Sequence, residues 1–367
     1  RLPPFGAKDS RVTISNSGGV SYTQNDNTNL RRAVTEETEL GFDAVLFNRL
    51  NLQFNYAFSN SKNDFISVPA FGPISGSANI YDNLGAVKSN SLELEVNGKV
   101  LDRNKFSWTT GLAFSKVRSK IISLGSVPEF TSNGYRKSVG SSTTAIYGYS
   151  ILSDFSELQT NDQGYVINAG DGTKKVADYA VNEFGVLVEK DKLGTANEVP
   201  VFYVNAATGN AKVIGEASPD FLVGFSNTFS YGRFSLYSVF DWQQGGEKFN
   251  ETAQYLTYVY RSEFSDQSAL AGKPLNFTTQ VFNASQVTDY WIEKTTYLAL
   301  RELSLSYKIP TEKLGISKVL KHANFSLIGR NLFILTNYKG VNVDGLGQDG
   351  FNYPSYRIVS GKLTLNF

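Results

Sequence analysis

The chain has 367 residues and contains neither cysteine nor methionine, so a disulfide framework and a cysteine-based metal site are both excluded. Its 35 Lys and Arg residues balance 34 Asp and Glu residues, and the resulting net charge of +1 gives no electrostatic reason to expect a nucleic-acid partner. The longest apolar run is four residues, far short of the about 18 that a transmembrane helix needs.

Apolar and polar residues alternate with a period of two along much of the chain, as they do in strands that have one apolar and one polar face. For example, Leu50, Leu52 and Phe54 alternate with Asn51 and Gln53. In chain order the predicted strands are 35–47, 50–59, 86–100, 106–115, 219–231, 234–243, 296–309, 323–336 and 355–367. Each is about ten residues or longer, which is the length that a tilted strand needs to cross a bilayer.

Short polar connections alternate with long irregular ones. The short connections are Asn48-Arg49, Asp102 to Lys105, Gly232-Arg233 and 310–322, and the long ones are 60–85, 118–218, 244–295 and 337–354. Outer-membrane barrels show this asymmetry between short periplasmic turns and long extracellular loops. The sequence therefore predicts an all-β fold, a transmembrane antiparallel β-barrel with four long extracellular loops. The alternative is a secreted β-sandwich, β-helix or adhesin, which would have shorter strands and a turn signal about every 8–12 residues.

The strand count predicts that this barrel is incomplete on its own. Residues 1–34 are expected to be the remnant of an extracellular loop, and 35–367 a barrel portion whose ninth strand ends on the periplasmic side. Nine strands that start outside cannot close a single-chain barrel, and open edges would leave backbone groups unpaired in lipid. We therefore expect the rest of the wall from another polypeptide or from residues outside this chain. Residues 1–20 have no apolar signal segment and look like the interior of a longer polypeptide.

Five stretches carry motifs that occur together in this order in one family. They include Pro-Asp-Phe at 219–221, Tyr-Leu-x-Leu-Arg at 297–301 and Gly-Arg-Asn-Leu-Phe at 329–333. The full stretches are Asn29–Ile66, Ser218–Asn250, Trp291–Pro310, Phe325–Asp344 and Tyr353–Phe367. In these stretches the chain resembles the C-terminal part of the SusC/RagA family of TonB-linked outer-membrane proteins.

The resemblance implies a barrel of about 22 strands, of which nine are somewhat under half. It implies TonB-dependent import of a nutrient, either a glycan or a peptide, across the outer membrane of a Gram-negative bacterium. The partners it implies are the remaining N-terminal barrel and plug polypeptide, a SusD-like surface lipoprotein that lids the barrel, TonB (reached through the missing region) and outer-membrane lipid.

The chain departs from the family pattern at two places. Ala299 replaces the first Arg of the Tyr-Leu-Arg-Leu-Arg signature. Between Tyr203 and Gly209 the family often carries an acidic loop, but this segment contains no carboxylate. Because a hard cation such as Ca²⁺ requires several oxygen ligands, no metal site is predicted there.

Five carboxylates fall on the polar faces of neighbouring predicted strands and are the candidates to face the lumen. They are Glu37, Glu39, Asp43, Glu93 and Glu95. Such residues could contact a plug or a solute, or could solvate the water-filled interior that every large barrel has, and the second interpretation is favoured. Neither a catalytic residue, a cofactor site nor a metal site is predicted. The last residue, Phe367, resembles the aromatic signal by which barrel strands are recognised for assembly.

Two further features bear on function. His322 is the only histidine and lies in a short connection, where a solvated turn residue is expected rather than a metal ligand or a triad member. The long loop 118–218 contains aromatic residues that could stack on sugars or form a small core of their own: Tyr135, Tyr147, Tyr149, Phe155, Tyr165 and Tyr179.

Three functions compete on this evidence. The first is a TonB-dependent importer of the SusC type. The second is a SusC-like barrel that serves as a structural subunit of a larger outer-membrane machine without transport. The third, an outer-membrane enzyme, is the weakest, because the sole histidine is expected at the opposite end from the outer rim.

Overall fold

The computed structural model describes residues 11–14, 20–23, 30–69, 79–125, 128–132, 135–205, 210–259, 261–263, 287–316, 318–345 and 347–367. The chain divides into two units. The first comprises residues 1–42, 54–93 and 117–145, and the second comprises 43–53, 94–116 and 146–367.

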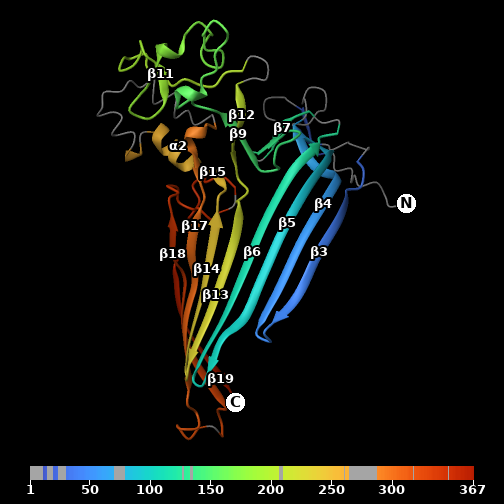
Figure 1. The fold of residues 1–367 in the computed structure, drawn as a ribbon, viewed down its shortest axis with the longest axis vertical. Helices are drawn as coiled ribbons and strands as arrows, with labels where there is room; N and C mark the ends of the chain where they lie inside the picture. The colour runs from blue at the N-terminus through green and yellow to red at the C-terminus, as the bar shows by residue number, and fades with distance from the viewer. Residues whose placement is uncertain are drawn as a thin grey trace. The chain divides into compact units, whose positions relative to one another are not determined.

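The largest sheet has nine strands, which are the nine predicted from the alternation (Figure 1). They are β3 (Val34–Leu46), β4 (Leu50–Pro69), β5 (Asn79–Arg103), β6 (Phe106–Ser123), β13 (Phe221–Tyr231), β14 (Phe234–Gln244), β17 (Tyr297–Ile309), β18 (His322–Thr336) and β19 (Ile358–Asn366). Their order, β19-β18-β17-β14-β13-β6-β5-β4-β3, follows the chain. The neighbouring strands from β6 to β19 pair antiparallel, and β3 and β19 form the edges of the sheet. The predicted fold, part of an antiparallel barrel that is incomplete on its own, is confirmed.

Three of these strands are much longer than the sequence predicts. β4, β5 and β6 have 20, 25 and 18 residues, so the predicted loop 60–85 narrows to 70–78, which lies outside the described residues. The predicted loop 118–218 likewise begins later, after Ser123. Alternation reports only the part of a strand that has an apolar environment on one side, whereas backbone pairing continues beyond it.

The first turn also differs from its prediction by one residue. Asn48-Arg49 was expected, but the central residues are Phe47 and Asn48, with φ of 55° and 52°, and the Arg49 amide donates to the Leu46 carbonyl over 3.0 Å. Positive φ at both central positions gives a turn whose twist matches that of the two strands. Asparagine tolerates this conformation, whereas a phenylalanine there is unusual and could not be foreseen from propensity.

Smaller elements occupy the long connections. β1 (Arg11–Ile14) and β2 (Val20–Thr23) pair within the predicted loop remnant 1–34, of which 1–10, 15–19 and 24–29 lie outside the described residues. A second sheet has the order β12-β9-β8-β7, and β10 pairs with β11 and β15 with β16. The bounds are β7 (Phe130–Ser132), β8 (Tyr135–Lys137), β9 (Ala145–Tyr149), β10 (Tyr179–Val181), β11 (Leu187–Glu189), β12 (Ala211–Glu216), β15 (Glu247–Phe249), β16 (Ile292–Lys294), α2 (Glu251–Tyr258), and the 3₁₀ turns η1 (Phe155–Glu157), η2 (Val176–Asp178) and η3 (Asp289–Trp291).

Burial in the large sheet is the reverse of that in a soluble protein. On β18, Leu327 and Leu335 are 50% and 60% exposed, whereas Ser326, on the opposite face, is only 7% exposed. The same apolar face continues on the neighbouring strands, where Leu305 and Leu363 are also exposed. An extended apolar face of this kind marks a surface that contacts something other than water.

Candidate functional site

The five predicted lumen-facing carboxylates are all exposed, and each occupies an alternate position on its strand. Three lie on β3 and two on β5: Glu37, Glu39, Asp43, Glu93 and Glu95. The amide of Asn55 on β4 donates to the Glu39 carboxylate, and that of Asn97 donates to the Glu95 carboxylate. Two of the five carboxylates therefore accept a hydrogen bond from a nearby asparagine side chain. That these residues face a lumen stays a prediction.

Small hydroxyl side chains line the polar face of the other strands. A row of serines runs in register across five strands, from β6 to β18: Ser107, Ser230, Ser235, Ser306 and Ser326. Ser230 and Ser235 lie within 3.2 Å of each other, and Ser306 and Ser326 within 2.8 Å. Four of the five hydroxyls are thus hydrogen bonded in pairs, and all five side chains are short.

A charged cluster lies near the loop-side end of the same polar face. The guanidinium of Arg301 on β17 donates to Asp241 on β14 through Nε at 3.0 Å and Nη2 at 2.8 Å. Its Nη1 donates to Asp344 in the loop after β18. The Tyr297 hydroxyl donates to the same Asp241 oxygen over 3.0 Å. One arginine thus joins two strands of the sheet to a loop, and a fork of several donors suits this role better than a lysine would.

Local backbone geometry places Arg301 in this cluster. The register between β14, β17 and β18 shifts at Arg301, so that Leu300 and Leu303 both remain on the apolar face. Opposite this bulge, β18 bulges at the Gly-Arg-Asn-Leu-Phe segment, where Asn331 has a φ of 50°. A bulge inserts an extra residue and redirects a side chain. The two motifs quoted from the sequence therefore encode paired bulges.

A buried lysine anchors the loop that contains Asp344. The ammonium of Lys248, on β15, donates to the carbonyls of Asn342, Val343 and Gly345 at 3.0, 3.3 and 2.6 Å. The residue is 7% exposed, and burial lowers the pKa of Lys248 although Asp349 and Asp344 oppose that shift. All three ammonium hydrogens are thus used by the loop backbone.

Asp349 holds the other end of this loop. Its carboxylate is fully buried and accepts from the Tyr338 hydroxyl at 2.8 Å and from the Val341 amide at 2.9 Å. Burial, followed by the hydrogen bond to Asp349, raises the pKa of Tyr338 well above its usual value. The Asp349 carbonyl accepts from both the amide and the hydroxyl of Thr252 at the start of α2. The loop after β18 is therefore fixed by polar groups from two other segments.

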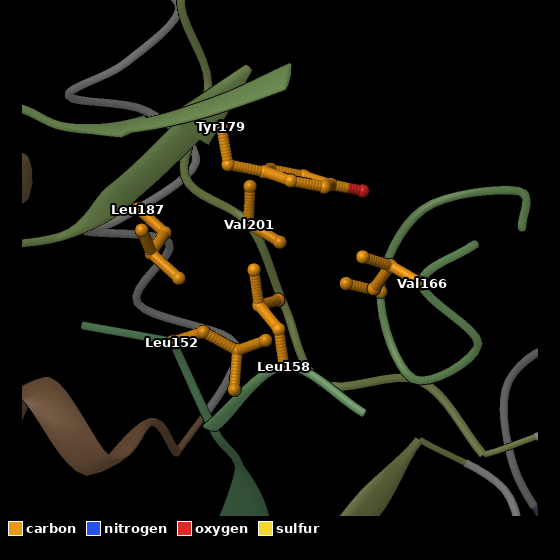
Figure 2. Packing of buried hydrophobic residues seen from close by; sticks show 7 residues of the cluster. Leu152, Leu158, Val166, Tyr179, Leu187 and Val201 are labelled. Carbon is orange, nitrogen blue, oxygen red and sulfur yellow. The ribbon is translucent and has the colours of Figure 1, made fainter. Parts of the chain in front are cut away.

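The long loop after β6 contains a lobe with its own apolar core, part of which Figure 2 shows. The core residues are Leu152, Leu158, Val166, Ala169, Tyr179, Leu187 and Val201. Tyr179 is 4% exposed, so for this residue the core interpretation holds and a sugar-stacking role does not. Phe155, by contrast, is 42% exposed.

The lobe is attached to the connection between β14 and β17. The Ile151 amide donates to the Asp289 carboxylate over 2.8 Å, and the Tyr149 amide donates to the Val287 carbonyl over 2.8 Å. Ile151 also packs with Phe249 and Trp291 in a second apolar cluster. Burial raises the pKa of Asp289, which hydrogen bonds from Ser150 and Ile151 lower only in part.

Two further sequence candidates, His322 and Phe367, lie at or just beyond the ends of strands. His322 is the first residue of β18, is exposed and pairs in register with Asn366. Phe367 is 75% exposed just after β19, and its assembly role stays a prediction. Within the described ranges no group of three or more His, Asp or Glu side chains could hold a metal ion. No described helix has the length and apolarity to span a membrane.

Sequence reasoning missed the cluster of Asp241, Arg301 and Asp344, although a signal was present. Arg301 ends the Tyr-Leu-x-Leu-Arg motif, and Asp344 ends the fourth of the quoted stretches. The pairing joins residues 43 and 60 positions apart. It depends on strand register and on the fold of a loop, and neither can be read from the local sequence.

Comparisons with known proteins agree with this architecture. No family model matches the chain. Two TonB-dependent receptors of Formosa agariphila, P3 and P39, are 24% and 23% identical to it over 100% and 95% of its length. The chain spans 37% of each of these receptors, somewhat over a third.

Solved structures of the RagAB peptide importer in a closed-closed state and of the RagAB peptide transporter superpose with TM-scores of 0.69 and 0.68. They are 20% and 18% identical, and the match covers 97% and 98% of the chain but 38% of each solved chain. The resemblance seen in the sequence motifs is thus confirmed: in sequence and in fold, the chain is similar over its whole length to part of the barrel of SusC/RagA-type TonB-dependent receptors.

Proposed function

We propose that the chain forms the C-terminal barrel portion of an outer-membrane importer that takes up a nutrient in a TonB-dependent manner. The observation that supports this most is the reversed burial of the nine-stranded sheet, with exposed leucines on one face and serines on the other. A bilayer would cover the apolar face, and water or a plug would fill the space beside the polar face. The similarity to TonB-dependent receptors supports the energy source.

The nutrient is a glycan or a peptide in this proposal. The RagAB structures, which share the fold, are described as those of a peptide importer. The carboxylates Glu37, Glu39 and Asp43 would line the polar wall on β3 and keep it hydrated. The row of serines has short side chains and would let a plug lie close to the strands.

The proposal includes a SusD-like surface lipoprotein that closes over the extracellular end. The lobe that begins after β6 has an apolar core and two attachments to the connection before β17, so it would offer a firm surface to such a partner. The N-terminal barrel and plug polypeptide would complete the wall beside β19 and β3, whose edges would otherwise expose backbone groups to lipid.

Uptake by whole cells tests this proposal. Cells that carry or lack the full-length gene, each with and without TonB, would be supplied with fluorescent oligosaccharides and oligopeptides. We expect accumulation of one class of solute to require both the receptor and TonB. Uptake that continues without TonB would contradict import of this type. Failure to take up any solute, together with isolation of the chain in a large assembly without a plug, would favour the structural-subunit alternative.

A further inference from the structure

The end of the nine-stranded sheet that carries the short connections is rich in exposed cations. The short connections, the four residues on each side of them and the end of β19 make up 43–53, 100–109, 228–237, 306–325 and 363–367. Their described residues include three carboxylates, Asp43, Asp102 and Glu312, and eight exposed cations. Four of the cations are Arg49, Arg103, Lys105 and Arg233, and the other four are Lys308, Lys313, Lys318 and Lys321.

These cations are not neutralised within the part of the chain that the structure describes. None of the eight forms an ion pair there, whereas one of the three carboxylates, Asp102, already pairs with Lys99 over 2.9 Å. The excess of positive charge is therefore open to solvent, and this end of the sheet attracts anions.

The connection between β17 and β18, residues 310–321, has a defined backbone conformation. The Ile316 amide donates to the Thr311 carbonyl over 3.1 Å, and the Thr311 hydroxyl donates to the Lys321 carbonyl over 3.2 Å. The Lys321 amide donates to the Asn366 carbonyl over 2.8 Å and so joins the connection to the end of β19, which lies at the same end of the sheet (Figure 1). The side chains that this connection presents to solvent are thus held in place by its own hydrogen bonds.

Three apolar side chains of this connection are exposed beside its lysines. Leu314, Ile316 and Val319 are 58%, 41% and 70% exposed, and Lys313 and Lys318 lie next to Leu314 and Val319 in sequence. Apolar side chains gathered on a surface mark a contact site. Apolar side chains together with lysines are the combination by which segments bind at the surface of an anionic membrane.

Aromatic residues on the apolar face place this connection at the level of lipid head groups. A row of them runs in register across five strands, from β6 to β18: Phe106, Tyr231, Phe234, Tyr307 and Phe325. The rings of Phe234 and Tyr307 have centroids 4.8 Å apart. Tyrosine favours the border between an apolar phase and water, and the connection begins at Pro310, three residues after Tyr307.

Two kinds of partner carry the required negative charge, namely anionic lipid and an acidic protein. The apolar face of the sheet, which a bilayer would cover, extends to the aromatic row and continues into the exposed side chains of the connection. A membrane that covers the first surface lies beside the second without any further assembly. Continuity with the apolar face therefore favours lipid.

We propose that the connection between β17 and β18 lies on the membrane surface and binds anionic phospholipid in the leaflet on that side. Leu314, Ile316 and Val319 enter the boundary between head groups and acyl chains. Lys313, Lys318 and Lys321 contact lipid phosphates. The proposal requires the sheet to lie in a bilayer, as the proposed importer does, but it does not require that a solute be transported.

Hydrogen exchange of the full-length receptor in lipid nanodiscs tests the proposal. The nanodiscs would contain either phosphatidylcholine alone or an equal mixture of phosphatidylcholine and phosphatidylglycerol, and exchange would be followed at the amides of Leu314, Ile316 and Val319. We expect exchange to be at least about tenfold slower in the mixture. High salt should reduce this difference, because it screens the attraction between lysine and phosphate.

Three outcomes would overturn the proposal. The first is equal exchange in the two kinds of nanodisc. The second is equal protection in phosphatidylcholine nanodiscs by free glycerol phosphate, which would assign the surface to a soluble anion. The third is equal protection there by polyglutamate, which would assign it to an acidic protein.

A triple lysine variant with a matched control tests the role of the charges. Lys313→Gln, Lys318→Gln and Lys321→Gln together should reduce the difference between the two lipids at least about tenfold. The control replaces three other exposed lysines by glutamine and should keep the difference within about twofold. These lysines are Lys190, Lys294 and Lys339.

A second triple variant tests the apolar contacts. Leu314→Ser, Ile316→Ser and Val319→Ser together retain the lysines but should speed exchange of the connection in the mixed nanodiscs. Heat-modifiable electrophoretic mobility would confirm that each variant still forms a folded barrel. An unchanged lipid dependence in both triple variants would refute the assignment. Because uptake is measured separately in cells, failure here leaves the import proposal standing.

Discussion

The hydroxyl of Tyr338 donates a 2.8 Å hydrogen bond to the carboxylate of Asp349, which is fully buried in the loop after β18. The same carboxylate oxygen accepts from the Val341 amide. The phenol therefore stabilises the buried carboxylate and helps to hold the loop against the end of the sheet.

Replacing Tyr338 with phenylalanine should loosen that loop. The variant leaves the Asp349 carboxylate with backbone donors only, and we expect a loss of about 1–3 kcal/mol in the local opening free energy. Hydrogen exchange at the Val341 and Asn342 amides measures the effect. Tyr353→Phe is the matched control, because Tyr353 is 85% exposed and should leave the exchange unchanged. Equal exchange in Tyr338→Phe and wild type would show that the phenol does not hold the loop.

Protonation of Asp289 should strengthen the attachment of the lobe. Burial raises its pKa above the ordinary 3.8, so its contribution to stability is full below about pH 3.8 and is lost as the pH rises through the folded-state pKa. Asp289→Asn keeps an oxygen that can accept from the Ile151 amide but removes the charge. We expect this variant to flatten the pH dependence of hydrogen exchange in residues 146–205 and to be no less stable than wild type at pH 7. A pH dependence equal to that of wild type would contradict this.

Asn331 should tolerate glycine better than alanine. Its φ of 50° lies in the left-handed region, which glycine adopts without strain, and its side-chain amide donates to the Tyr356 carbonyl over 3.2 Å. Both variants lose this hydrogen bond, but Asn331→Ala also incurs backbone strain of about 1–2 kcal/mol. Equilibrium unfolding of the receptor in urea compares the two free energies. Equal stability of the two variants would show that the bulge relaxes.

Two adjacent positions on β19 distinguish the two faces of the sheet. Val359 pairs with Gly329 on the apolar face, and Ser360 pairs with Ile328 on the polar face. An arginine at 359 should destabilise the receptor in a bilayer by about 2–4 kcal/mol if the position lies near the midplane, whereas an arginine at 360 should cost little. Heat-modifiable electrophoretic mobility after folding into lipid vesicles reports the folded fraction. A larger loss for Ser360→Arg would reverse the assignment of the faces.

Much of the fold was predictable because strand alternation is a local property. Leu50, Leu52 and Phe54 show it within five residues, and the apolar environment of a barrel wall enforces it on every spanning strand. The ends of β4 and β5 were not predictable, since strand pairing continues where neither face needs to be apolar. Phe47 lies in the first turn for a similar reason. The twist between the two strands, rather than residue preference, decides which two residues adopt positive φ.

The sequence by itself determined the nine strands, their order and the family resemblance, because all three rest on short-range pattern and motif. Only the tertiary structure decided what meets across the sheet and its loops. Arg301 contacts Asp241 and Asp344 because a bulge shifts the register between strands, and Lys248 contacts Asn342 because two distant loops fold together. The cost of closing such long connections is offset by many contacts at once, so no single segment of sequence records the outcome.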